Sequence, residues 1–129
     1  MSREKGLIYV HEVKKLLEAI GHQVEGPGYM IIYIPLNPGA YKLGINRATK
    51  PIQVHKDYFG VADLISYFEG KLILHQVTDL SNKSIHVKAI QERGLSAWVW
   101  CRFNEGRRIG YRIFFVDLLV EEGEIIWRG

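Results

Sequence analysis

Cysteine is nearly absent from this chain, with Cys101 the single example in 129 residues. An internal disulfide is therefore impossible, and a zinc site built from several cysteines is not expected. Cys101 lies within the alternating apolar run of residues 98–103, and the sequence places no histidine beside it. We therefore expect a thiol that packs within a strand and not a nucleophile.

Long apolar segments are missing too. The opening residues MSREKG have no apolar core of the kind that a signal peptide carries. No apolar run approaches the length that a membrane-spanning helix needs. We therefore expect an intracellular, cytoplasmic protein with no membrane partner.

Signatures of several enzyme classes are also absent. The sequence has no G-x-x-x-x-G-K-[ST] loop, which disfavours nucleotide hydrolysis, and no G-x-S-x-G, which argues against an α/β-hydrolase. None of the five histidines forms a pair at metal-ligand spacing, so we expect a packing or surface role for each. His55 and His86 have a further alternative as phosphate contacts.

What is present is the composition of one globular domain. Hydrophobic residues make up 47% and charged residues 24% of the chain, and its length suffices for a single core. No repeat, low-complexity segment or linker divides it, so we expect one domain over residues 1–129. The net charge of +3 permits nucleic-acid binding without requiring it.

Hydrophobic periodicity predicts two helices. Residues 9–20 carry apolar side chains at helical spacing and end before Gly21, a natural stop. Residues 81–93 form the second helix, with Ser81 or Asn82 as its cap.

Short apolar runs between the helices predict strands. The segment 37–54 holds two prolines and two glycines and is expected to be a long loop, and residues 121–123 are expected to be a turn. The order of elements predicts an α/β or α+β fold with a central mixed sheet flanked by helices, in which the unit around the second helix is a right-handed crossover. The expected strands cover residues 29–34, 61–65, 72–78, 97–103, 108–119 and 124–127.

The hairpin over residues 57–78 is the most informative stretch. Its first strand carries one acid, Asp63, and an ionised carboxylate in an apolar strand is costly unless a cation or hydrogen bonds compensate it. The second strand ends with Gln76 and Thr78, which point to the same face because they are two residues apart. This is the layout of a small oxygen-rich metal or phosphate site.

These residues resemble the motif of the PD-(D/E)xK nucleases, the restriction-endonuclease-like superfamily. The nearest likeness is to archaeal Holliday-junction resolvases and related phage or viral nucleases. The family pattern is a basic residue and glycine before a helix with an inward acid, an aspartate on a hairpin strand, E-x-K or Q-x-K on the next strand, and a basic helix. The matching residues, within 5–93, are Lys5-Gly6, Glu12, Asp63, Gln76-Val77-Thr78 and the helix from Asn82 to Lys88.

The resemblance implies a restriction-endonuclease-like fold and a Mg²⁺- or Mn²⁺-dependent endonuclease. Such an enzyme would act on branched or duplex DNA as a homodimer, and could be encoded by a phage or virus. Asp63, Gln76 and Glu12 would hold the cation through hard oxygen ligands. Thr78 stands where the family has lysine, so Thr78 or Lys83 would take the place of the lysine that orients the attacking water.

Each candidate has a structural alternative. Asp63 could be a hydrogen-bonded acid at a strand end, and Gln76 a satisfied amide at the edge of the core. Glu12 could pair with Lys15 or Lys5 at the surface. Asp57 could be an acid that precedes the hairpin or part of a solvated turn.

Basic side chains before the hairpin and on the second helix are candidate phosphate contacts. In the expected fold they flank Asp63 and give salt-sensitive, sequence-independent affinity for DNA. Solvated surface charge is the alternative for each. The expected DNA contacts are Lys42, Arg47, Lys50, Lys56, Asn82, Lys83 and Lys88.

Two other functions stay open. The same fold without chemistry would be a DNA-binding or accessory protein, because only one carboxylate lies in the hairpin and E-x-K is missing. A plain interaction module is the third hypothesis, in which Trp98, Trp100 and Trp127 form an exposed patch.

Overall fold

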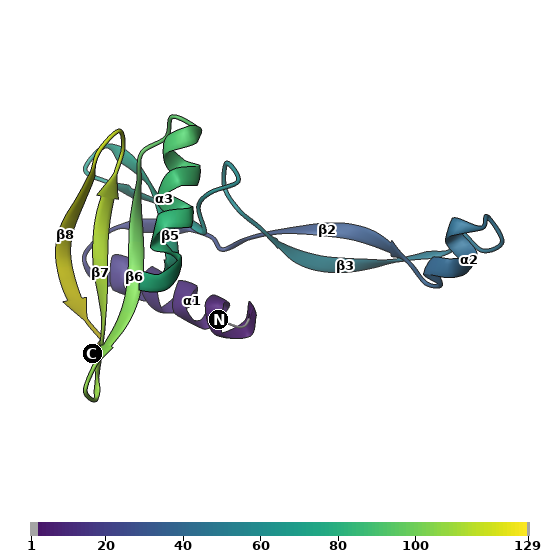
Figure 1. Ribbon diagram of the computed structural model, residues 1–129, viewed down its shortest axis with the longest axis horizontal. Coiled ribbons are helices and arrows are strands. Elements are labelled where there is room, and N and C mark those ends of the chain that lie inside the picture. The colour runs from purple at the N-terminus through teal and green to yellow at the C-terminus, as the bar shows by residue number, and fades with distance from the viewer. Residues whose placement is uncertain (1–2, 129) are drawn as a thin grey trace.

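A computed structural model describes residues 3–128, and the side chains of residues 6–128. Its body is a mixed sheet with a helix packed on either face, and a long two-stranded arm projects from it (Figure 1). The elements are α1 (Arg3–Ala19), β1 (Gln23–Glu25), β2 (Gly28–Pro35), α2 (Pro38–Lys42), β3 (Thr49–Lys56), β4 (Leu64–Phe68), β5 (Lys71–Asp79), η1 (Leu80–Asn82), α3 (Lys83–Glu92), β6 (Ala97–Glu105), β7 (Arg108–Val116) and β8 (Val120–Trp127).

The main sheet has the strand order β1-β4-β5-β6-β7-β8. Strands β5 and β6 run parallel and are joined through α3, and every other neighbouring pair is antiparallel. The α+β class, the central mixed sheet and its flanking helices are therefore confirmed.

Two apolar cores lie on opposite faces of this sheet. On one face, α1 packs Val13 and Leu17 against Leu64, Val77 and the buried central part of the sheet. On the other face, α3 packs against strands β6 and β7, and this core includes the buried Cys101. Cys101 is fully buried in this core, so the expected packed thiol is confirmed, and burial raises the pKa of that thiol to about 12.

The segment 37–54 is not a loop. Strand β3 pairs with β2 over its full length, and α2 closes the far end, where Asn37 accepts a hydrogen bond from the N–H of Ala40. The apolar run of β2 needs a partner strand, and 49–56 supplies it despite Pro51 because a two-stranded ribbon leaves one backbone edge of each strand free of ladder bonds. We call residues 28–56 the arm (Figure 1).

Three other expectations are corrected. Residues 121–123 lie within β8, and the reversal occurs before Val120. Asn82 is the N-cap residue of α3, but its side chain makes no cap hydrogen bond. The side-chain cap is that of the preceding η1, where Asp79 Oδ1 accepts the Asn82 N–H at 3.0 Å. Trp100 is fully buried, so it belongs to no exposed patch.

No helix of the described residues has both the length and the apolar character that crossing a membrane requires.

Candidate functional site

Asp63 directly precedes β4, at the point where β4 stops covering the edge of β5. Its backbone N–H donates to the carbonyl of His75 at 2.8 Å, which continues the antiparallel ladder by one bond. One step further along β5, the side chain of Asp63 supplies the acceptor that a paired strand would give, because its Oδ2 accepts the N–H of Val77 at 2.9 Å. The backbone and side chain of Asp63 together satisfy the edge of β5, which fixes the carboxylate beside Gln76.

At the base of the arm, a histidine and a second acid lie beside this carboxylate. His55 Nε2 lies 3.2 Å from Oδ1 of Asp63 and 3.0 Å from Oδ1 of Asp57. One ligand atom from each of these three residues lies within 4.8 Å of the other two. We call His55, Asp57 and Asp63 the acid–histidine cluster.

An open cavity of about 280 Å³ lies against the cluster. The start of α1 forms one wall and β5 the other. Asp63 and Gln76 both line it, so the two side chains that the motif joins do meet in one hollow. The full lining is Gly6, Leu7, Val10, His55, Asp63, Gln76 and Val77.

The electrostatics of the cluster favour an added positive charge. Burial raises the pKa of the Asp63 carboxyl, and the hydrogen bond from Val77 N–H opposes this shift. The charge of Asp57 raises the pKa of Asp63 further, whereas His55 lowers it. A cation placed between these side chains would stabilise both carboxylates in their ionised form.

Glu12 lies elsewhere, which corrects its expected role as a ligand. Its Oε1 accepts the hydroxyl of Tyr111 at 2.7 Å, and its Oε2 pairs with Arg128 at 3.0 Å. Neither Glu12 nor Thr78 lines the cavity, although Thr78 is buried nearby on β5. Glu12 is occupied because α1 turns its side chain toward β7 and β8, so the α1 wall of the cavity is apolar.

Of the expected phosphate contacts, only Lys56 lies beside the cluster. Eight paired residues at about 3.3 Å each put the far end of the arm roughly 25 Å from its base. Lys42, Arg47 and Lys50 therefore do not flank Asp63. On the second helix, the Lys83 ammonium lies over the ring of Phe114 at 4.3 Å, Lys88 pairs with Glu92 at 3.9 Å, and the Asn82 N–H donates to Asp79.

Sequence reasoning gave no metal-binding role to His55 and Asp57. Residues two apart on an extended strand share a face, and His55-Lys56-Asp57 has this spacing at the end of β3. The signal was present, but residues 55–57 were assigned to no strand, so this facing rule was not applied to them.

No protein-family model, no curated protein and no solved structure matches this chain.

Proposed function

We propose that this protein is a divalent-metal-dependent DNA endonuclease whose metal ligands are His55, Asp57 and Asp63. The main observation in support is that three ligand atoms of these residues lie within 4.8 Å of one another, beside an open cavity that Gln76 also lines. The preference for branched over duplex DNA rests on the resemblance to resolvases.

The donor set suits a divalent cation that accepts both nitrogen and oxygen. Carboxylates favour Mg²⁺ and Mn²⁺, whereas an imidazole favours the transition metals. One imidazole with two carboxylates therefore makes Mn²⁺ the better fit than Mg²⁺. When bound, the cation would neutralise charge on a phosphate and lower the pKa of a water.

Other residues at the cavity would hold the Asp63 carboxylate in place and contact the phosphates of DNA. The Val77 N–H holds Oδ2 of Asp63, which leaves Oδ1 to face His55 and the cation. The Gln76 amide makes, among the described residues, one long hydrogen bond of 3.4 Å to the Val77 carbonyl, and it can donate to a phosphate oxygen. Lys56, exposed at the base of the arm, can contact the adjacent phosphate.

The order of elements also supports this function. A first helix, an aspartate at a hairpin strand, Gln76 on the next strand and a following helix occur here in the order that the resemblance implies. The apolar cavity wall from α1 is a departure from that pattern.

The second candidate is a DNA-binding protein that does not cut. It is favoured by the described lining of the cavity, which holds no lysine or arginine to orient an attacking water. Both functions require DNA binding, and only the first requires metal-dependent cleavage.

Cleavage assays separate the two. Purified protein is incubated with a four-way junction and with a matched linear duplex, each with Mn²⁺, Mg²⁺ or a chelator. The nuclease proposal expects cleavage of the junction with Mn²⁺ that stops with the chelator and with Asp63→Asn.

The matched control is Glu105→Gln, which changes an exposed acid at the turn between β6 and β7, outside both the cluster and the cavity, and should leave cleavage unchanged. Junction binding without cleavage would favour the second candidate. Neither binding nor cleavage would exclude both.

A further inference from the structure

The arm exposes more apolar surface than a monomer in water normally leaves uncovered. No residue of the arm is buried, and most of its large side chains are aliphatic or aromatic. Contiguous apolar surface of this kind marks an interaction site. Ten of these side chains are Tyr29, Met30, Ile31, Ile32, Tyr33, Ile34, Leu36, Tyr41, Leu43 and Ile45.

The tip of the arm, residues 36–47, combines this surface with positive charge. Leu43 and Ile45 are 74% and 77% exposed. Lys42 and Arg47 flank them, and neither forms an ion pair among the described residues, where Arg47 instead lies 5.9 Å from the ring centroid of Tyr41. The whole arm contains no aspartate or glutamate. The tip therefore offers two apolar side chains between two free cations.

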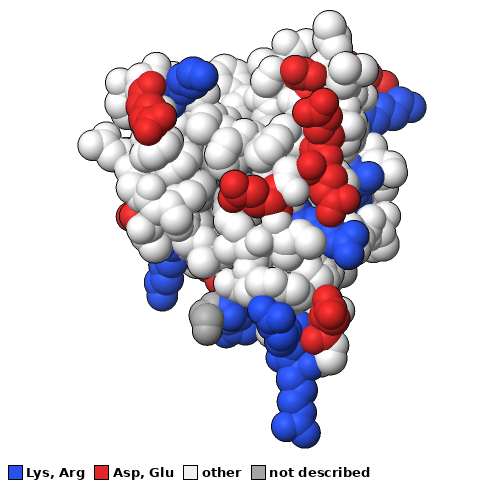
Figure 2. Space-filling model, turned by 90° about the vertical axis from the view of Figure 1, so that its left-hand side faces the viewer, with Lys and Arg blue, Asp and Glu red and all other residues white. Residues whose placement is uncertain are grey.

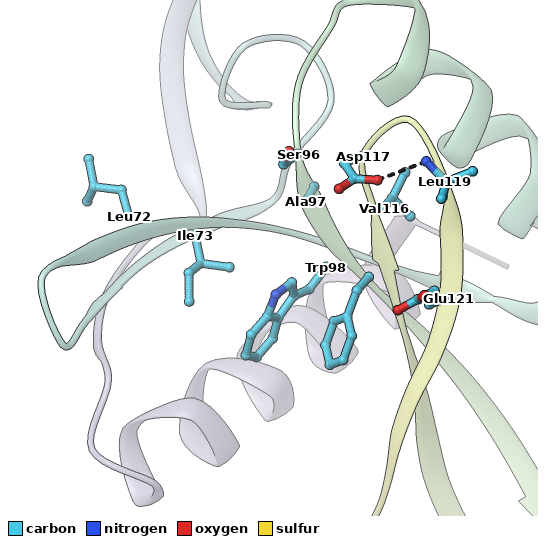
Figure 3. A pocket seen from close by; sticks show the side chains of 10 residues that line it. Leu72, Ile73, Ser96, Ala97, Trp98, Val116, Asp117, Leu119 and Glu121 are labelled. Atoms are coloured by element: carbon cyan, nitrogen blue, oxygen red, sulfur yellow. Dashed lines mark hydrogen bonds between the residues drawn. The ribbon is translucent and has the colours of Figure 1, made fainter.

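An apolar pocket with acidic residues at its rim lies at the end of the sheet where β5 and β6 begin. It has a volume of about 360 Å³ and is built on Leu72, Trp98, Phe115 and Leu119. Figure 3 shows Leu72 and Ile73 on one side of it, Trp98 in the middle, and Leu119 and Glu121 on the other side. Its rim carries two carboxylates, and no lysine or arginine lines it.

These two carboxylates are available to a partner. Asp117 accepts the N–H of Leu119 at 2.8 Å, and neither Asp117 nor Glu121 has a cation partner within residues 6–128. Two further acids follow along β8, of which Glu122 is paired with Arg112 at 3.8 Å and Glu124 has no cation partner within residues 6–128. The face of the molecule turned away from the arm shows carboxylates over its upper and middle part with some lysines and arginines beside them, and a larger group of lysines and arginines at its lower end (Figure 2).

We propose that the tip of the arm docks into this pocket on a second copy of the chain. Leu43 and Ile45 would enter the apolar pocket, while Lys42 and Arg47 would meet Asp117 and Glu121 at its rim. The contact is between copies because the tip and strands β7 and β8 lie at opposite ends of the molecule (Figure 1). This inference does not depend on the proposed nuclease activity.

Mutual exchange of two arms makes a closed dimer. Each copy has one tip and one pocket, so a two-fold axis that seats each tip in the other pocket leaves neither free. The tip presents more large apolar side chains than cations, which favours a protein pocket over the phosphate backbone as its partner. Binding of the tip to duplex DNA is the alternative, and the experiments below also test it.

Sedimentation velocity over a range of protein concentrations at about 0.15 M salt measures the association. We expect wild-type protein to form dimers, and Leu43→Asp or Ile45→Asp to weaken the dimer at least about tenfold. Ile85→Asp is the matched control, since Ile85 is similarly exposed on α3 but lies outside both surfaces. A wild-type protein that stays monomeric would overturn the proposal.

A charge exchange tests the pairing of tip with pocket. Arg47→Glu and Glu121→Arg should each weaken the dimer, and the double variant should recover part of the lost affinity because the two charges are exchanged. Assemblies larger than a dimer that weaken with the single substitutions and recover in the double variant would also support the contact. Dimers indifferent to all four substitutions would overturn it, as would a monomer whose affinity for duplex DNA falls with Leu43→Asp.

Discussion

Asp63 Oδ2 accepts a hydrogen bond of 2.9 Å from the backbone N–H of Val77, at the place where β5 loses β4 as its neighbour. The same carboxylate turns its other oxygen toward His55, at 3.2 Å. One oxygen therefore has a structural role and the other faces the acid–histidine cluster. The two roles can be separated by substitution.

Asp63→Asn and Asp63→Ala should differ in stability. The asparagine carbonyl oxygen can still accept the Val77 N–H, and because burial disfavours the charged carboxylate, we expect Asp63→Asn to stay within about 1 kcal/mol of wild type. Asp63→Ala leaves that buried N–H without a partner and should lose about 1–3 kcal/mol. Urea unfolding measures both free energies. Equal stability of the alanine variant and wild type would contradict the structural role.

Glu12 should matter for stability and not for chemistry. Tyr111→Phe removes a 2.7 Å hydrogen bond to this carboxylate and should lower the free energy of unfolding by about 1.5–3 kcal/mol. Glu12→Gln should retain metal binding and any cleavage, because Glu12 does not line the cavity. Loss of metal affinity in a folded Glu12→Gln variant would contradict this and show that Glu12 contributes to metal binding.

Acid should destabilise the fold through His75. Trp100 Nε1 donates to His75 Nδ1 at 2.9 Å, so the neutral ring carries its proton on Nε2, which lies 2.7 Å from Ser66 Oγ. Burial lowers the pKa of His75 to about 3, and His22 acts in the same direction. The unfolded chain therefore binds the proton first, and stability is lost as the pH falls below about 6.5 toward 3.

The slope of this loss approaches about 1.4 kcal/mol per pH unit. Urea unfolding at pH 7, 6, 5 and 4 measures it, and His75→Gln should flatten the curve while the exposed control His11→Gln should not. The raised pKa of Asp63 acts with the opposite sign, and it is common to all these variants. An unchanged slope in His75→Gln would refute the assignment.

Much of the body could be predicted from local pattern. The Glu69-Gly70 turn and the helix before Gly94 each depend on neighbours in sequence, and each occurs as expected. The strand expected over residues 108–119 also occurs, but it ends at Val116. The meeting of Asp63 with Gln76 also followed from the short hairpin. The α1 boundary differed, since the helix begins at Arg3 rather than near Tyr9.

The arm could not be predicted in the same way. Its second strand contains Pro51 and polar residues, and what makes it a strand is pairing with β2, across residues 36–48. His55 and Asp57 reach Asp63 only because β3 pairs back along β2 to the base of the arm, so their meeting with Asp63 could not be predicted without that pairing. The role of Glu12 was misjudged because its partners Tyr111 and Arg128 come from the last strands, about a hundred residues away along the chain.

His55, Asp57 and Asp63 are proposed to hold one divalent cation. Isothermal titration calorimetry with Mn²⁺ measures this binding, with wild type, Asp63→Asn and the remote control Glu105→Gln compared at pH 7. The account expects one Mn²⁺ per chain in wild type and in the control, and at least about tenfold weaker binding in Asp63→Asn. No saturable binding to wild type, or equal affinity in folded Asp63→Asn, would contradict it.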